Sequence, residues 1–176
     1  TADFGFRAEV SAEGRLFNPA FGGGSLLDVG IYPVSLASMV FGPPTQITSQ
    51  AHLGETGVDE EAAAILGYAR GQLALLSSAI RANTPQEAVL VGTKGSLRIQ
   101  SPWWRPTVMN LRREDGRPRA ERHRRIRINW PWMQTLSLSL SLSTGCENTL
   151  EFPVEGNGYQ YEAMEVMRCL RHGQME

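Results

Sequence analysis

The chain has 176 residues, the length of one ordinary or slightly large domain, and its 41% hydrophobic content is enough to build a core. Seventeen basic and eighteen acidic residues give a formal net charge of -1, so the overall charge favours neither nucleic acid nor an anionic membrane as partner. Cys146 and Cys169 lack the spacing of a metal site, and two thiols do not make a disulfide framework. We therefore expect a cytoplasmic protein without a membrane span or signal peptide.

The predicted first helix follows three consecutive glycines, 22 to 24. Ser25 has the place of an N-cap, and Asp28 occupies the third helical position of this capping-box pattern. The helix is expected to bend at Pro33 and to end at Gly42. Its apolar stripe is predicted to be Leu26, Leu27, Ile31, Val34, Leu36 and Val40.

Outside this helix, residues 4–10 and 45–101 have the pattern of short strands joined by turns. Turns at Arg70-Gly71 and Lys94-Gly95 favour hairpins, hence a mainly antiparallel sheet with the first helix on one face. Three alanines at 62–64 are compatible with helix, but the hairpin signals beside them favour strand. The expected strands are Phe4–Val10, Gln46–Leu53, Ala62–Tyr68, Gln72–Arg81, Gln86–Val91 and Ser96–Gln100.

Regularity is lost between Trp103 and Asn148. Residues 112–127 hold eight arginines and three acidic residues, a net charge of +5, and are interpreted as a solvated loop rather than a phosphate-binding segment. The Leu-Ser repeat at 136–143 alternates with period two and predicts an edge strand of weakly specified register. A strand at Thr149–Val154 and a helix at Tyr159–Arg171 complete the expected elements.

Several kinds of site are excluded by position. Leu27 stands where a dinucleotide fingerprint starting at Gly22 needs glycine or alanine, and it also breaks the nucleophile-elbow pattern. Lys94 lies in a turn without the glycine frame of a phosphate-binding loop. The three histidines are too scattered for a metal site, so no metal is expected.

Asp28 and Tyr32 form the candidate site that remains. Their i, i+4 spacing places a carboxylate and a phenol on one face of a helix. A phenol can protonate a developing alkoxide while a carboxylate orients it. The alternative is that Asp28 caps the helix and Tyr32 is a core aromatic. Likewise, Trp103-Trp104 and the tryptophans at 130 and 132 are either pocket walls or core anchors.

The motifs at this site resemble a known family. The segments RLFNP at 15–19, GGGSLLDVGIYP at 22–33 and FG at 41–42 resemble the second domain of the glucose-fructose oxidoreductase, inositol dehydrogenase and MocA-type family. Further segments are similar to its branch containing dimeric dihydrodiol dehydrogenase: ETGVD at 55–59, VGTKG at 91–95, SPWWRP at 101–106, GYQYEA at 158–163 and RCL at 168–170. The resemblance covers about residues 1–106 and 149–176.

This resemblance implies an α+β fold: a large, mostly antiparallel open sheet with helices packed on one face, like the C-terminal domain of glyceraldehyde-3-phosphate dehydrogenase. It implies Asp28 and Tyr32 as catalytic residues, with Arg15, Asn18 and Trp104 near the substrate. In the family, NAD or NADP is bound mainly by a Rossmann domain that precedes this one. We therefore expect residues 1–176 to be a single substrate-binding and oligomerisation domain, a fragment without that Rossmann domain, with 107–148 as an irregular insertion.

The resulting hypothesis is an NAD(P)-dependent oxidoreductase that acts on a sugar, polyol or dihydrodiol-type alcohol and its carbonyl. Tyr32 would give a proton to the substrate oxygen or take it back, and Asp28 would orient the substrate and Tyr32. The fragment alone is predicted to be inactive. A homo-oligomer formed through the open sheet face is expected. The alternative is a non-catalytic ligand-binding or dimerisation module of the same fold. A nucleic-acid binder acting through the arginine run ranks third.

Overall fold

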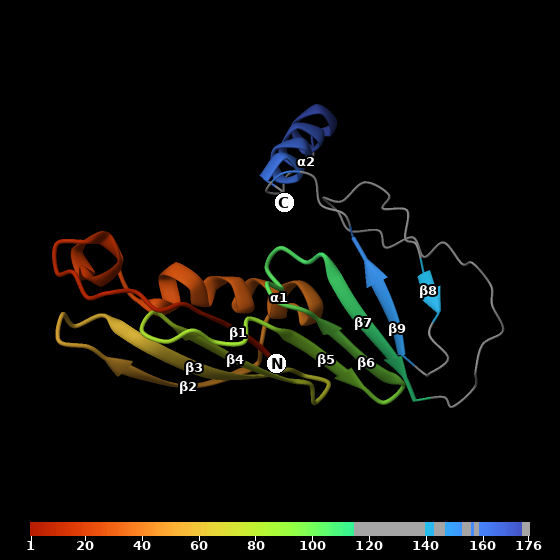
Figure 1. The fold of residues 1–176 in the computed structure, drawn as a ribbon, viewed down its shortest axis with the longest axis horizontal. Coiled ribbons are helices and arrows are strands. Elements are labelled where there is room, and N and C mark those ends of the chain that lie inside the picture. The colour runs from red at the N-terminus through yellow and green to blue at the C-terminus, as the bar shows by residue number, and fades with distance from the viewer. Residues whose placement is uncertain (115–139, 143–146, 153–155, 157–158, 174–176) are drawn as a thin grey trace. The chain divides into compact units, whose positions relative to one another are not determined.

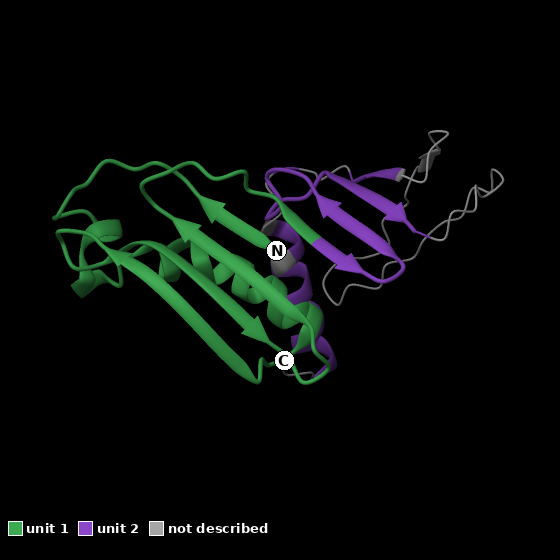
Figure 2. Cartoon of the chain, turned by 90° about the horizontal axis from the view of Figure 1, so that it is seen from below, with its two compact units in different colours: residues 1–89 green, residues 90–176 purple. Residues whose placement is uncertain are grey.

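The computed structural model describes residues 1–114, 140–142, 147–152, 156 and 159–173. The chain divides into two compact units, residues 1–89 and residues 90–176, which Figure 2 shows in green and purple. The candidate residues Asp28 and Tyr32 both belong to the first unit. The two units are described separately below.

The sheet of the first unit has the strand order β2-β3-β4-β1. Strand β3 pairs antiparallel with both neighbours, whereas β1 pairs parallel with β4, so that Ala2 lies opposite Leu76. Strand β5 starts at the end of this unit and pairs antiparallel with β1 through Ala2 and Ala88. The bounds are β1 Ala2–Gly5, β2 Gln46–Leu53, β3 Asp59–Gly67, β4 Leu73–Ala79 and β5 Ala88–Gly92.

A helical layer covers one face of this sheet (Figure 1). Two short 3₁₀ turns, η1 Arg15–Phe17 and η2 Pro19–Phe21, precede a π-helical turn, η3 Leu26–Gly30, which continues into α1 Ile31–Phe41. Both η3 and α1 contact β1 and β4. The helix ends as predicted: Gly42 has φ +77°, and its backbone N–H donates to the Ser38 carbonyl at 2.7 Å.

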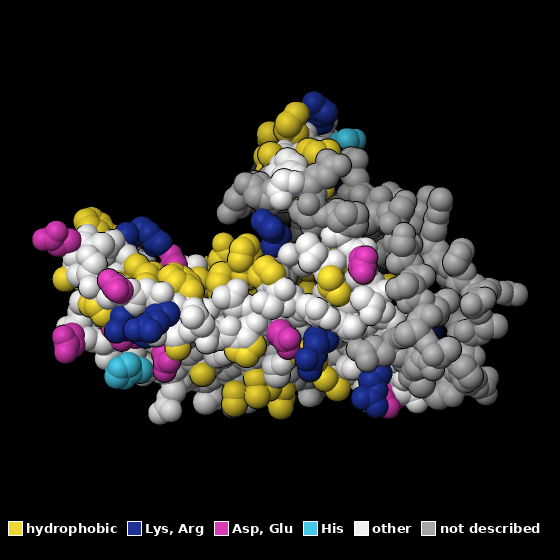
Figure 3. Space-filling model, viewed as in Figure 1, with side chains coloured by type: hydrophobic (Ala, Val, Ile, Leu, Met, Phe, Trp, Pro, Cys, Tyr) yellow, Lys and Arg dark blue, Asp and Glu magenta, His cyan; other side chains and the backbone are white. Residues whose placement is uncertain are grey.

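The helical layer buries small residues, which corrects the predicted apolar stripe. The buried positions are Val29, Gly30, Pro33 and Ala37, whereas Leu26, Leu27, Ile31 and Val40 are exposed. A Cβ added at Gly30 would lie 3.0 Å from Ser78 Oγ, so the helix backbone closely approaches β4. Close approach favours small side chains underneath the helix, and the large apolar side chains therefore form an outer face (Figure 3).

The buried core of the first unit joins the helical layer to the residues around the strand ends. Phe17, Val29, Val58 and Ile80 form a buried cluster. Phe4, Phe6, Ala8 and Leu16 pack against it and are partly buried. The short η1 turn thus contributes an anchor, Phe17, which fixes Arg15 close to the start of the long helix.

The second unit has the strand order β6-β7-β9-β8, with each neighbouring pair antiparallel. Its elements are β6 Gly95–Ile99, β7 Val108–Arg113, β8 Leu140–Leu142, β9 Glu147–Glu151 and α2 Tyr159–His172. Strand β7 and the start of β9 fall in the range 107–148 that was expected to be irregular, whereas β8 lies within the Leu-Ser repeat and at the edge of the sheet, as predicted for that repeat. Residues 136–139 and 143 of the Leu-Ser repeat, Cys146, and most of the arginine run lie outside the described residues.

The predicted α+β class with a mostly antiparallel sheet is confirmed. Strand β2 has the predicted bounds, and the alanines at 62–64 are in a strand, β3. The first strand is shorter and earlier than predicted, Ala2–Gly5. Beyond it, the Phe6 and Ala8 N–H groups bond the carbonyls of Ala79 and Ile80, so the chain still follows the end of β4 without being a regular strand.

The stretch Pro19–Phe41 is long and apolar enough to cross a membrane by length and composition, against the sequence-based expectation, and one third of its apolar 18-residue part is buried. It is interrupted by Gly22 at φ +67° and Gly24 at φ +116°, and its helical end packs on β1 and β4. The core helix of a soluble protein passes the same test, so this is weak evidence for a membrane span.

Candidate functional site

Asp28 forms an ion pair with Arg15. The Arg15 Nη2 donates to Asp28 Oδ1, and the side chains are 61% and 18% exposed, respectively. The two residues come from η1 and η3, thirteen positions apart. The structure thus brings together two of the residues predicted for the site. A largely enclosed carboxylate with a cation at its open side can orient a hydroxyl group of a bound molecule.

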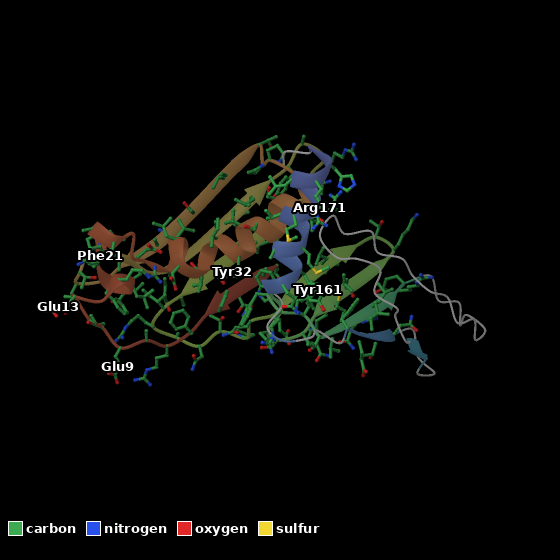
Figure 4. All side chains as sticks on the ribbon, turned by 90° about the horizontal axis from the view of Figure 1, so that it is seen from above. Glu9, Glu13, Phe21, Tyr32, Tyr161 and Arg171 are labelled. Atoms are coloured by element: carbon green, nitrogen blue, oxygen red, sulfur yellow. The ribbon has the colours of Figure 1, made fainter. Side chains whose placement is uncertain are left out.

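Tyr32 follows in the first turn of α1, where the helix runs over β1 (Figure 4). Its ring meets the ring of Phe4 edge to face, with centroids 5.2 Å apart and planes at 75°. The residue is 41% exposed, so Tyr32 is not the buried core aromatic of the alternative interpretation. Phe4 supports one side of the ring and leaves part of the residue accessible.

The start of η3 is held differently from the prediction. Ser25 does not cap the helix with its side chain. Instead, the carboxylate of Asp59, the first residue of β3, accepts hydrogen bonds from the Leu26 N–H at 2.7 Å and from Ser25 Oγ at 2.8 Å. The Asp28 side chain pairs with Arg15 and is not a cap. Capping by Asp59 is thus the feature of this site that sequence reasoning missed.

The turn that carries Asp28 is π-helical, and α-helix begins at Ile31. A π-helix closes its hydrogen bonds from i to i+5 and therefore turns less per residue than an α-helix; such turns are frequent at functional sites. The α-helical geometry assumed for Asp28 and Tyr32 consequently applies only to the second half of the interval between them. Pro33, where the sequence predicts a bend, is the third residue of α1 and lies just after the π-helical turn.

Asn18 and Trp104 are the other two predicted substrate residues. The Asn18 side chain shapes its own loop: Oδ1 accepts from the Ala20 N–H at 2.9 Å, and Nδ2 donates to the Ala12 carbonyl at 3.3 Å. Trp104 belongs to the second unit, where it is exposed while Trp103 is buried. A role in substrate binding remains a prediction for both residues.

The described residues contain no cluster of histidine, cysteine, aspartate and glutamate that could hold a metal ion. They also do not fit a dinucleotide cradle. The Gly22–Gly24 turn joins η2 to η3 and follows no strand, whereas dinucleotide phosphates are held where a strand turns into a helix. The groups that the site itself offers for chemistry are the Asp28 carboxylate, the Arg15 guanidinium and the Tyr32 phenol.

Comparison with known protein families identifies this architecture. Residues 1–98 match the model of the GFO/IDH/MocA C-terminal domain, which covers more than half of the chain. The chain belongs to the GFO/IDH/MocA family. The match includes every predicted site residue except Trp104. The family predicted from the sequence motifs is thereby confirmed.

The curated relatives come from the expected branch of the GFO/IDH/MocA family. The chain is 43% identical over 108 residues to trans-1,2-dihydrobenzene-1,2-diol dehydrogenase of Xenopus tropicalis, covering 60% of this chain and 32% of the relative. It is 38% identical over 179 residues to the enzyme of that name from Mus musculus, covering 99% of this chain and 45% of the relative. The chain thus spans less than half the length of these relatives.

Solved structures of two oxidoreductases share the fold of this chain. A 3-ketoreductase from Actinomadura kijaniata in complex with NADP and TDP-benzene has a TM-score of 0.70 at 16% identity, covering 99% of this chain and 46% of that one. An aldose-aldose oxidoreductase from Caulobacter crescentus complexed with glycerol has a TM-score of 0.69 at 20% identity, covering 98% and 45%. At these identities the similarity establishes the fold.

Proposed function

We propose that this chain is the substrate-binding and oligomerisation domain of an NAD(P)-dependent oxidoreductase that interconverts an alcohol and a carbonyl in a sugar, polyol or dihydrodiol. The observation that carries the proposal is the Arg15–Asp28 ion pair together with a half-exposed Tyr32, four residues after Asp28 on the same helical segment. Family membership supports it, as do relatives named as dihydrodiol dehydrogenases.

Tyr32 is the proton donor and acceptor in this proposal. Its phenol protonates the substrate oxygen during reduction and takes the proton back during oxidation, a role that typically contributes about 10²–10⁴ in rate. The edge-to-face contact with Phe4 fixes the ring, so the hydroxyl stays oriented between turnovers. Asp28 accepts a hydrogen bond from the substrate, and Arg15 fixes the position of Asp28.

In this proposal the hydride is transferred to or from a nicotinamide cofactor that another part of the protein binds. The described residues offer no dinucleotide cradle. The outer face of η3 and α1 supports this arrangement. Leu26, Leu27 and Ile31 are exposed on the helical segment that also carries Asp28 and Tyr32. A cofactor-binding domain packed on these side chains excludes water beside the reacting groups.

The open face of the first unit's sheet is the proposed oligomer interface. Ile65 on β3 lies opposite Leu75 on β4, and both are about half exposed on the face away from α1. Leu73 extends this apolar surface along β4. We also propose a cytoplasmic location, which the low cysteine content favours.

The deciding experiment is the Tyr32→Phe substitution in the full-length enzyme, assayed with NADH and NADPH against carbonyl compounds of the sugar and dihydrodiol classes. The expected result is a fall in kcat of about 10² or more, because the ring and its contact with Phe4 stay while the proton is lost. The matched control is Tyr68→Phe. The Tyr68 hydroxyl is buried without a hydrogen-bond partner among the described residues, so its removal should leave kcat unchanged.

Wild-type kcat in Tyr32→Phe would exclude Tyr32 from the reaction. Absence of turnover by the wild-type full-length protein, combined with saturable binding of a sugar or diol, would favour the alternative of a non-catalytic ligand-binding module. Residues 1–176 alone should oxidise no NAD(P)H, and measurable oxidation would contradict the assignment of the cofactor to another part of the protein.

A further inference from the structure

We propose that Asp59 is a positioning residue for this site: its carboxylate fixes the start of η3 and thereby the placement of Asp28 and Tyr32. The inference rests on the proposed function for its kinetic consequences. Asp59 belongs to the sheet, and its hydrogen bonds go to Ser25 and Leu26 rather than to the proposed catalytic residues. It acts through the helix start.

The hydrogen bonds of Asp59 join the sheet directly to the helix. One oxygen, Oδ2, accepts from both the Leu26 N–H at 2.7 Å and Ser25 Oγ at 2.8 Å. Ser25 is completely buried, and its hydroxyl lies 3.0 Å from the hydroxyl of Ser78 on β4. The start of η3 is thus attached to β3 by charge-assisted hydrogen bonds and to β4 by a buried hydroxyl pair, so it cannot shift along or rotate against the sheet without breaking these contacts.

Gly24 shows how closely the carboxylate and the chain approach each other. A Cβ added at Gly24 would overlap Asp59 Oδ1, and the residue has φ +116°, where side chains other than hydrogen are strained. The Gly24 N–H also donates to the Leu16 carbonyl at 2.9 Å, next to Arg15. The same short segment therefore aligns η1, which carries Arg15, with η3, which carries Asp28.

The helix transmits this alignment to the reacting groups. Asp28 is the third residue of η3 and Tyr32 is the second residue of α1, both within two turns of the Asp59 cap. The start of this π-helical turn has no side-chain cap from Ser25, so the Asp59 carboxylate supplies the side-chain acceptor for the Leu26 N–H. Loss of the carboxylate should loosen the turn and displace the carboxylate and phenol relative to Arg15 and Phe4.

The test compares Asp59→Ala, Asp59→Asn and the control Glu61→Gln in the full-length enzyme, alone and in the Tyr32→Phe background. Glu61 is an exposed carboxylate on the same strand. We expect Asp59→Ala to lower kcat by about 10- to 100-fold with KM and cofactor affinity little changed, since small displacements of reacting groups have costs of this size. Asp59→Asn keeps an oxygen acceptor and should recover most of the kcat.

Two readouts separate positioning from a general structural role. Backbone amide exchange of residues 26–32 should accelerate in Asp59→Ala below its melting temperature and remain normal in Glu61→Gln. In the Tyr32→Phe background, Asp59→Ala should cost less kcat than in the wild-type background, because one of the two groups that it positions is already absent. Unchanged exchange, or an equal loss of kcat in both backgrounds, would overturn the proposal.

Failure of the proposed function gives a different pattern. If Tyr32→Phe alone has wild-type kcat, Tyr32 is not the proton donor, and the role of Asp59 is then decided by amide exchange of residues 26–32: acceleration in Asp59→Ala supports it, and wild-type exchange overturns it.

Discussion

The start of η3 and the helix α2 are fixed by opposite kinds of contact. At η3 the partners of Leu26 and Ser25 are Asp59 and Ser78, 33 and 53 positions away along the chain, respectively. In α2, Arg168 bonds Glu165 three residues before it, at 2.6 and 2.9 Å. Contacts within a helix stabilise helical structure wherever the helix lies, whereas contacts from distant strands fix its place. The proposed catalytic groups follow a helix start that is held by contacts from distant strands.

Gly24→Ala should have the largest effect on stability in the first unit. The new Cβ combines overlap with Asp59 Oδ1 and a strained φ, and it should lower the free energy of unfolding by about 3 kcal/mol or more. Equilibrium urea unfolding of the full-length protein measures this change.

The control is Gly57→Ala, at φ +85° with no atom within 4 Å of the added Cβ. It tests the strain without the overlap and should cost about 1–2 kcal/mol. Equal losses for the two variants would mean that the approach of Gly24 to Asp59 does not contribute, and would weaken the contrast between fixed and locally stabilised helices.

Arg15→Ala should separate stability from activity. Arg15 is largely exposed, so loss of its ion pair should change the free energy of unfolding by at most about 1 kcal/mol. Activity should fall by about tenfold or more in kcat/KM, because Asp28 loses the group that orients it. Arg7→Ala is the control for charge alone, because the hydrogen bond of Arg7 to Asn83 comes from its backbone N–H and survives the change. Activity unaffected by Arg15→Ala would remove Arg15 from the site.

The smallest effect is expected for the contact within α2. Hydrogen bonds from Arg168 hold the pKa of the Glu165 carboxyl below its ordinary value of 4.5. A lowered pKa in the folded state means that this interaction stabilises α2 above about pH 4.5 and is lost as the pH falls through the lowered value. A carboxyl ¹³C titration should show a midpoint below 4.5, moving up in Arg168→Ala; identical midpoints in the two proteins would refute the interaction.

The sequence predicts the elements of this fold well and their contacts poorly. Hairpin signals located β2 to β6 within a few residues, because turn residues and alternation are local properties. The predicted buried face of the helix was wrong, because burial there depends on a contact between distant parts of the chain. Leu26 and Ile31 are more apolar than Gly30 and Ala37, yet the close approach to β4 selects the small residues for burial, and no single segment encodes that approach.

The same distinction applies to the site. Asp28 and Tyr32 could be found by their spacing and by family resemblance, and Arg15 by resemblance alone. Asp59 could not be assigned as a cap, because its partner Leu26 lies 33 positions earlier and Ser25 offered a local cap that fits the same pattern. The carboxylate reaches the helix start through the contact of β3 with η3, which joins parts of the chain that lie far apart in sequence.

The helical layer has a further consequence for the behaviour of the first unit in solution. Because its inward residues are small, Leu27 and Ile31 are exposed on the outer face of the helical layer. Ile65 and Leu75 are exposed on the opposite face of the sheet. Two different exposed apolar surfaces on opposite faces permit heterologous, head-to-tail contacts, which form open assemblies rather than closed oligomers. When produced without the rest of its protein, this unit should therefore form concentration-dependent fibrous or polydisperse assemblies, visible by light scattering, and a charge placed at Leu27 should terminate their growth.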